Sequence, residues 1–387
     1  MFERRLKPSL LAAAEDYPVV TVLGPRQSVK TTLVRAAFPD KPYISLESPD
    51  VRARVAADPR AFLASVPDGA ILDEVQRLPE LLSYVQGLVD ERPETGRFVL
   101  TGSFRTELKK GIGQTLAGRT AVFRLLPLSL DELGDAARPF DLWHEVHGGA
   151  FPRLRERSLE PGLFYSSYLA TFLERDLGAQ VQVRDLNQFR DFLRLLAGRV
   201  GQLVNFASLG NDLGASANTM RHWLSALEAS WLVVQLSPWF ENFGKRVIKS
   251  PKVYFTDTGL ACALLGTETP AQLSRDPLAG GLVENWVLAE HLKRRWNAGR
   301  DAHMHFFRDR HGAEVDLLLA RGRALVPVEI KAARTFTPAH LKGIRRFRDL
   351  AGERVADAFL VFDGEDRATV DGVRLIGFDE LGVIDGA

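Results

Sequence analysis

One stretch near the amino terminus constrains the fold more than any other part of the chain. Residues 20–23 form a short apolar run, residues 24–29 a polar loop, and Lys30 opens a helical pattern. Strand, loop and helix in this order are typical of a phosphate-binding loop, whose backbone N–H groups and helix N-terminus surround phosphate oxygens. The pattern calls for glycine immediately before the lysine, but this chain has Val29.

Further apolar runs predict the rest of the first domain. Short strands at 42–46, 69–72, 97–100 and 122–125 alternate with helical segments. This alternation predicts an α/β fold with a parallel sheet and helices on both faces. In such sheets, ligands bind at the carboxyl ends of the strands.

The loop after the first strand supplies the predicted nucleotide site. We expect it to bind ATP through Gly24, Pro25, Arg26, Gln27, Ser28, Val29, Lys30, Thr31 and Thr32. Lys30 would reach the β- and γ-phosphates, and the Thr31 hydroxyl would coordinate Mg²⁺.

Two other strand ends carry candidate catalytic residues. Asp73 would hold the same Mg²⁺, and Glu74 would orient or deprotonate the attacking water. Thr101 or Ser103, on a neighbouring strand, could sense the γ-phosphate. Arg119 is a candidate arginine finger acting on a neighbouring subunit, although a surface ion pair explains a single arginine equally well.

Composition narrows the class of protein. A chain of 387 residues with 45% hydrophobic and 26% charged residues predicts two or three folded domains. A net charge of +1 provides no global field toward nucleic acid or membrane. Its single cysteine, Cys262, excludes an internal disulfide and is expected to be buried. With neither a signal peptide nor a membrane-spanning run, we expect a cytoplasmic protein without a membrane partner.

Four motifs together resemble one family. They are Gly-Pro-Arg-Gln-Ser-x-Lys-Thr-Thr-Leu at 24–33, Ile-Leu-Asp-Glu-Val-Gln at 71–76, Leu-Thr-Gly-Ser at 100–103 and Leu-Ala-Gly-Arg-Thr at 116–120. The chain resembles, essentially end to end, a large prokaryotic family of AAA-superfamily ATP-binding proteins with a C-terminal domain of unknown function. The resemblance implies an ATPase domain over 1–135, use of ATP and Mg²⁺, and assembly as a homo-oligomer.

The middle of the chain, 140–275, is predicted to be a helical and winged-helix domain. Residues 138–149 are expected to form a linker, and 207–227 have the proportions of a helix-turn-helix. Strands at 231–236 and 252–255 would complete a winged helix with a basic wing over 244–252. Candidate DNA contacts are Asn218, Arg221, Lys245, Arg246 and Lys249. A winged helix used only for packing between proteins is the alternative.

The last part, 276–387, resembles the PD-(D/E)XK nuclease core. Glu329 and Lys331 stand two apart on one predicted strand and so share a face, with Asp316 on the adjacent strand. The resemblance implies that Asp316 and Glu329 bind Mg²⁺, that Lys331 positions the water, and that Glu284 supports the metal. Exposed ion pairs, or a degenerate member that only binds or assembles, remain as alternatives.

Three functions therefore stay open. The first is an AAA-type ATPase that couples nucleotide binding or hydrolysis to the handling of DNA or a partner, impaired by Val29. The second is a pseudo-ATPase that assembles or binds DNA or a protein. The third is a Mg²⁺-dependent DNA nuclease regulated by the first domain.

Overall fold

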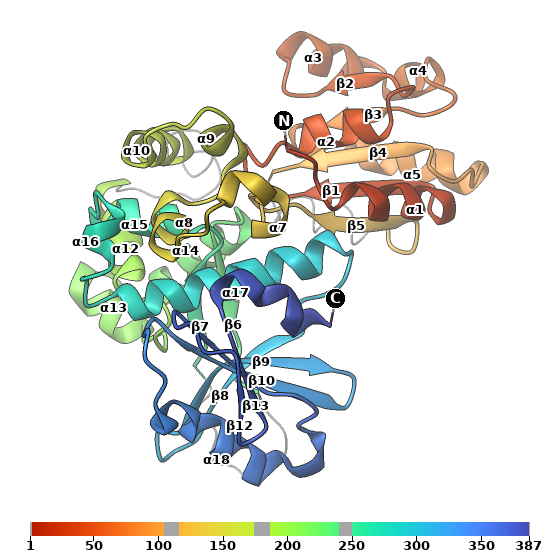
Figure 1. Ribbon diagram of the computed structural model, residues 1–387. Helices are drawn as coiled ribbons and strands as arrows, with labels where there is room; N and C mark the ends of the chain where they lie inside the picture. Colours follow the sequence, from red (N-terminus) through yellow and green to blue (C-terminus); the bar gives the residue numbers. More distant parts are fainter. Residues whose placement is uncertain (1, 104–115, 174–185, 240–249, 387) are drawn as a thin grey trace.

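The computed structural model of the protein contains a five-stranded sheet, a six-stranded sheet and a two-stranded sheet, connected by helices (Figure 1). The structure describes residues 2–103, 116–173, 186–239 and 250–386. The long helix α17 (Ala279–Asn297) lies between the N-terminal sheet and the C-terminal sheet (Figure 1). It contacts β5 of the first sheet and β10 of the second, so it connects the two ends of the molecule.

The N-terminal sheet is parallel throughout, in the order β2-β3-β4-β1-β5. Its strands are β1 (Val19–Leu23), β2 (Tyr43–Ser45), β3 (Ile71–Asp73), β4 (Phe98–Gly102) and β5 (Thr120–Arg124). Helices around it are α1 (Lys7–Asp16), α2 (Lys30–Ala37), α3 (Pro49–Ala57), α4 (Pro59–Ala64), α5 (Leu81–Glu91) and α7 (Leu130–Leu133). Every residue of β1 and β4 is buried, as expected for strands covered on both faces. The predicted α/β fold with a parallel sheet is therefore confirmed.

A helical region follows the first sheet. Its helices are α8 (Leu142–Gly148), α9 (Pro152–Glu156), α10 (Pro161–Phe172), α12 (Leu186–Ala197), α13 (Phe206–Leu213), α14 (Ala217–Ala229), α15 (Thr258–Leu265) and α16 (Pro270–Leu273). The expected linker at 138–149 is wrong, because most of it is α8. Asp141 caps this helix by accepting a hydrogen bond from the His144 N–H, and Leu142 and Val146 enter the core.

The helix-turn-helix proportions appear in α13 and α14. Gly214 ends α13 in the left-handed conformation, and Ser216 caps α14 by accepting from the Thr219 N–H. Strands β6 (Val233–Leu236) and β7 (Lys252–Phe255) pair antiparallel after them. Three of the predicted DNA contacts, Lys245, Arg246 and Lys249, lie outside the described residues.

The C-terminal sheet has six strands in the order β12-β13-β11-β10-β9-β8. They are β8 (Met304–Arg308), β9 (Glu314–Arg321), β10 (Ala324–Lys331), β11 (Phe359–Phe362), β12 (Thr369–Val370) and β13 (Val373–Ile376). Helix α18 (Lys342–Ala351) packs on β9 and β10, and a final 3-10 segment, η6 (Phe378–Asp385), returns to α17. The expectation that the tail adds strands to this sheet is confirmed.

One hydrophobic core joins the three regions. It contains Val19 of the first sheet, Leu193 of the helical region and Val328 of the last sheet. Cys262 belongs to it with 1% of its surface exposed, as expected. Burial raises the pKa of its thiol to about 12. Within the described ranges, no helix is both long and apolar enough to cross a membrane.

Candidate functional site

The loop between β1 and α2 curves around the side chain of Lys30. Gly24 follows β1 and packs closely against the backbone at Leu125, just after β5. A Cβ atom at position 24 would lie 2.1 Å from the Leu125 carbonyl oxygen, so the position requires glycine. The Lys30 ammonium donates to the carbonyl oxygens of Gly24 at 3.0 Å and Pro25 at 2.8 Å. The predicted loop therefore surrounds its own lysine at the N-terminus of α2.

Val29 is the N-cap of α2 and has a left-handed backbone, with φ of 61° and ψ of 32°. Glycine adopts this conformation freely, whereas a β-branched residue there is an outlier. The strain costs on the order of 1–3 kcal/mol. The backbone thus keeps a glycine-type conformation although the residue is valine.

A residue outside the loop supports this conformation. Arg4, only 5% exposed, donates to the Ser28 carbonyl oxygen at 2.8 Å and to the Leu126 carbonyl oxygen at 2.8 Å. Its guanidinium also pairs with the buried Glu132 at 3.0 Å. Burial works to raise the pKa of Glu132, but the charge of Arg4 and several donors outweigh it and lower that pKa. Arg4 carries no sequence signal, so sequence reasoning missed it.

Asp73 ends β3 beside α2, as predicted. Its Oδ1 accepts from the Thr31 hydroxyl at 3.0 Å and from the Thr101 hydroxyl, and its Oδ2 accepts from the Tyr43 hydroxyl at 2.7 Å. Burial and this bond raise the pKa of Tyr43 to about 12, so Tyr43 keeps its proton and remains a donor. Tyr43 was not predicted, because nothing in its local sequence points across to β3.

Glu74 and Ser103 also meet at this edge. The Ser103 hydroxyl donates to Glu74 Oε2 at 2.9 Å, and the Gln76 amide donates to the same oxygen and to Ser103 Oγ, the latter at 3.0 Å. The Glu74 backbone N–H donates to Thr101 at 3.2 Å. The two predicted sensor residues therefore contact the two carboxylates directly, and Gln76 is an addition to the predicted set.

A cavity of about 420 Å³ opens over the loop. Its floor includes Val29, Lys30 and Thr31, and its opposite wall is the end of α10, with Tyr168 and Phe172. The helical region therefore closes one side of the predicted nucleotide site. Arg26, Gln27, Thr32 and Glu74 also line this cavity.

Arg119 lies away from that cavity, at the amino end of β5. Thr120 pairs with Val19 at the start of β1, whereas the loop follows the end of β1. The Arg119 guanidinium forms an ion pair with Asp90, and its Nη2 donates a hydrogen bond to Asp90 Oδ2 at 3.0 Å. Both interpretations of Arg119 therefore remain open. The ion pair exists within the chain, and an arginine finger would require the nucleotide site of a second copy of the chain.

The residues at the carboxyl edge fit ATP and Mg²⁺. A hydroxyl and a carboxylate, Thr31 and Asp73, lie within 3.0 Å of each other, and oxygen ligands of this kind suit Mg²⁺. Lys30 stands at the helix N-terminus, where phosphate is favoured.

The predicted nuclease residues also come together. Lys331 lies 2.6 Å from Glu329 and 3.3 Å from Asp316, and the Ile330 N–H donates to Asp316 at 2.9 Å. Glu284, on α17, joins them through Lys252, which is 2.8 Å from Glu284 and 2.5 Å from Glu314. The expectation that Lys252 belongs to an exposed basic wing is wrong, since it is 1% exposed in β7.

Lysine side chains balance the charge of this acidic cluster. Two lysines occupy the positions beside its carboxylates, and no group of three metal-binding side chains was found among the residues that the structure describes. Burial and the neighbouring Asp316 raise the pKa of Glu284 to about 7 and that of Glu329 to about 8. Burial would lower the pKa of Lys252, but the surrounding carboxylates outweigh it and raise that pKa. In the described structure the cations that face these carboxylates are therefore the ammonium groups of Lys252 and Lys331.

The two described DNA candidates lie on the exposed face of α14. Arg221 donates to Asn218 at 2.8 Å and stacks over Phe206 with 5.0 Å to the ring centroid.

Comparison with known proteins assigns the parts of the chain. Residues 16–134 match the family model of an AAA domain. Residues 140–271 and 279–381 match two domains of unknown function, DUF8612 and DUF4143.

The uncharacterized protein Rv2008c of Mycobacterium tuberculosis is 35% identical over 371 residues, covering 95% of this chain and 81% of that protein. The uncharacterized protein Mb2031c of Mycobacterium bovis gives the same values. Among solved structures, the Walker-type ATPase of Pyrococcus abyssi aligns at 18% identity with a TM-score of 0.42, over 68% of this chain and 96% of that one.

The chain is therefore an AAA-superfamily protein with a C-terminal domain of the DUF4143 family. More closely, it belongs to the same family as the mycobacterial proteins Rv2008c and Mb2031c.

Proposed function

We propose that this protein is an AAA-type ATPase that couples ATP binding or hydrolysis to the handling of DNA or a protein partner, with its activity impaired by Val29. The observation that carries the proposal is the convergence of Lys30, Thr31 and Asp73 beside a 420 Å³ cavity at the carboxyl edge of the parallel sheet. Ligands bind at this edge in open α/β sheets.

Each residue of the site has a role in this proposal. Lys30 and the N–H groups of the loop would hold the phosphates, and Thr31 and Asp73 would hold Mg²⁺, which supplies positive charge where negative charge develops. Glu74, fixed by Ser103 and Gln76, would orient the attacking water. Homo-oligomers would allow Arg119 to reach a neighbouring site.

Val29 explains why impaired activity is expected. Its side chain lines the cavity where phosphate must approach the backbone closely, and its conformation is strained. We expect Val29→Gly to bind ATP at least about tenfold more tightly than the unchanged chain, which corresponds to about 1.4 kcal/mol. Isothermal titration with Mg²⁺ and ATP measures this difference.

Gln27→Gly is the comparison within the loop, because Gln27 has the same φ of 61° and also lines the cavity, but its exposed side chain is not β-branched. An equal gain in this variant would mean that loop flexibility, not the valine side chain, limits binding. If neither variant binds ATP, the chain is a pseudo-ATPase, and its first domain serves assembly or partner binding.

DNA handling is supported by the helix-turn-helix proportions of α13 and α14 and by the exposed Arg221. We expect Arg221→Ala to weaken binding of a short DNA duplex. Neutralising Lys245, Arg246 and Lys249 together should flatten the salt dependence of that binding. An unchanged slope would contradict a basic wing.

A Mg²⁺-dependent nuclease is the weaker candidate. The four predicted residues, Lys331 included, do cluster, but Lys252, which was not predicted there, forms an ion pair with Glu284. Incubation of supercoiled plasmid with Mg²⁺ tests it: cleavage lost in Lys331→Ala would establish a nuclease, and cleavage kept in that variant would point to another source.

A further inference from the structure

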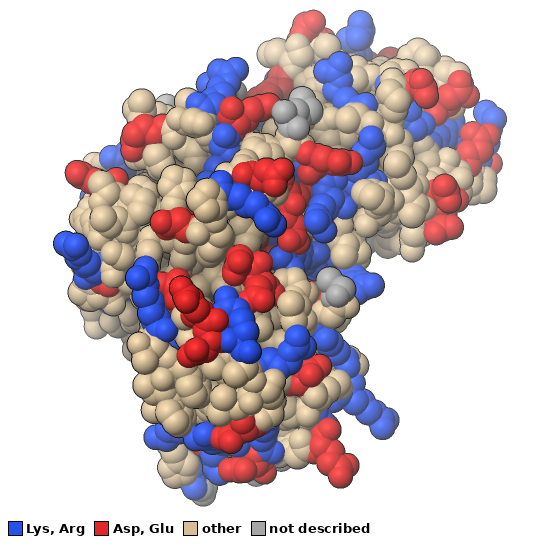
Figure 2. Space-filling model, in the orientation of Figure 1, with Lys and Arg blue, Asp and Glu red and all other residues tan. Residues whose placement is uncertain are grey.

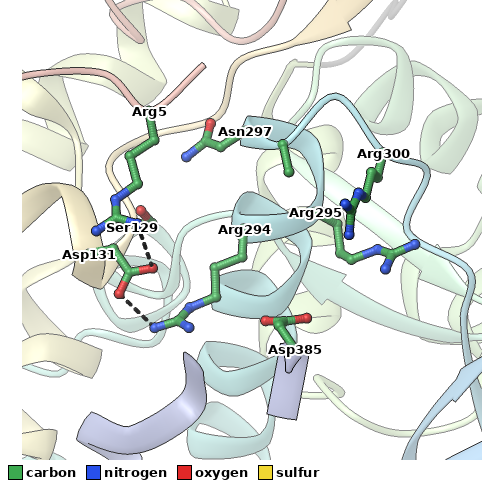
Figure 3. A pocket seen from close by; sticks show the side chains of 9 residues that line it. Arg5, Ser129, Asp131, Arg294, Arg295, Asn297, Arg300 and Asp385 are labelled. Carbon is green, nitrogen blue, oxygen red and sulfur yellow. Dashed lines mark hydrogen bonds and ion pairs between the residues drawn. The ribbon is translucent and has the colours of Figure 1, made fainter. Parts of the chain in front are cut away.

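A second cavity, of about 290 Å³, lies where α7, the end of α17 and the end of η6 meet (Figure 3). It is separate from the loop cavity, since the two share no lining residue. In the space-filling view, basic and acidic side chains meet in the notch between the N-terminal and C-terminal parts (Figure 2).

Positive charge exceeds negative charge in this cavity. Arg5, Arg294, Arg295 and Arg300 face only two carboxylates, Asp131 and Asp385. Arg5 and Arg294 point toward Asp131, whereas Arg295 and Arg300 lie together on the opposite side (Figure 3). Burial lowers the pKa of Arg295; Asp385 opposes this effect and the charge of Arg300 adds to it. The guanidinium groups on that side therefore repel one another.

Each carboxylate has a partner, although the buried Asp385 Oδ2 accepts no hydrogen bond among the described residues. Asp131 pairs with Arg294 at 2.8 Å and lies 4.0 Å from Arg5, and Asp385 lies 3.3 Å from His291. Arg300, by contrast, forms no ion pair with a carboxylate in the described part of the chain. An added anion would relieve the repulsion between Arg295 and Arg300.

Two buried donors in the cavity lack an acceptor. The Arg294 Nε and the Asn297 Nδ2 have no hydrogen-bond partner among the described residues. Asn297 is only 5% exposed, and its amide is turned toward the side of the cavity where Arg5 lies (Figure 3). A buried polar group without a partner costs about 1–3 kcal/mol, so such groups point to a ligand or a missing acceptor.

We propose that this cavity binds a small phosphate-bearing anion. The exposed guanidinium groups of Arg5 and Arg300 supply charged donors for phosphate oxygens, and Arg294 Nε and the Asn297 amide add buried donors. Arg295 contributes charge, since its Nε and Nη2 already donate to the Asp301 carbonyl oxygen. The cavity is open to the surface but has the volume of a small ligand, whereas a nucleic-acid backbone needs an extended basic groove. Small ligands often bind where different regions of a protein meet.

Isothermal titration of the full chain with pyrophosphate tests the proposal. The protein carries Lys30→Met, so that the loop after β1 does not bind the probe, and circular dichroism verifies folding of every variant. We expect Arg5→Gln combined with Arg300→Gln to weaken binding at least tenfold, because both side chains are exposed and hold few structural contacts. Asp385→Asn should instead tighten binding severalfold by removing a competing carboxylate.

Arg60→Gln is the control, an exposed arginine on α4 far from the cavity, and it should leave binding unchanged. Unchanged affinity in the double variant would overturn the proposal. So would a single-stranded oligonucleotide that binds more tightly than pyrophosphate and loses affinity in the same double variant, because the surface would then recognise nucleic acid.

Discussion

Two clusters of carboxylates in this chain differ in the groups that face them. At the edge of the N-terminal sheet, the donors to the Asp73 carboxylate within the described residues are the hydroxyls of Thr31, Thr101 and Tyr43. In the C-terminal sheet, Glu284 and Glu329 lie against the ammonium groups of Lys252 and Lys331. Hydroxyls leave the negative charge in place for an incoming cation, whereas lysines neutralise it within the fold. The two clusters therefore differ in what balances their charge: hydroxyl donors in the first and lysine ammonium groups in the second.

The largest expected effect is that of removing the buried lysine. Lys252→Met leaves Glu284 and Glu314 without their shared cation, and breaking a buried pair costs about 3–5 kcal/mol. Urea unfolding measures this loss, with the exposed Lys342→Met as control. A stability close to that of the unchanged protein would mean that Glu284 and Glu314 do not need Lys252 as their cation.

Replacing one aspartate in each cluster separates their roles. In the Val29→Gly background, Asp73→Asn should lower ATP hydrolysis about 10–100-fold, since mutation of groups around a metal has effects of this size. Asp316→Asn should leave hydrolysis within about twofold, because it lies in the lysine-neutralised cluster. Phosphate release assays measure both variants. Equal losses would contradict the division of the two clusters.

Stability should depend on pH through the C-terminal cluster. Glu329 has a folded-state pKa of about 8, above its ordinary value, owing to burial and Asp316. The folded state then binds more protons than the unfolded state, so stability is present at low pH and declines as pH rises toward 8. Urea unfolding at pH 5, 6.5 and 8 measures the decline, which should be shallower in Glu329→Gln. A decline of equal steepness would place the proton on another group.

The smallest expected effect concerns Tyr43. Tyr43→Phe removes one donor from Asp73 and should cost about 1 kcal/mol of stability. It should also increase the affinity of the loop for Mg²⁺ with ATP, because one carboxylate oxygen becomes free. Thermal unfolding and titration measure the two effects, and weaker binding would indicate that Tyr43 itself contacts the ligand.

Local patterns predicted much of this molecule, and long-range contacts account for the rest. The alternation of apolar runs predicted the parallel sheet and placed Lys30, Thr31 and Asp73 at one edge, because the order of elements alone determines which strand ends meet. The approach of Lys331 to both Glu329 and Asp316 likewise followed from strand periodicity and the hairpin order.

Other features depend on partners distant in sequence. Lys252 stands in a basic stretch of sequence, which predicted a residue of the wing. The structure instead buries it in ion pairs with Glu284 and Glu314, which lie 32 and 62 positions further along the chain. Residues 138–149 contain proline and two glycines, which suggested a linker. Packing of Leu142 and Val146 into the core outweighs that local preference and makes the segment helical.

Because of the contacts of Arg4, the conformation of the loop between β1 and α2 depends on residues far from it in the sequence. The carbonyl oxygen of Ser28 is held by a side chain that precedes α1, and that side chain is held in turn by Glu132, more than a hundred positions later. A peptide of the loop, or the loop grafted onto another sheet, would lack both anchors. The conformation of Val29 therefore belongs to the whole domain rather than to the motif that contains it.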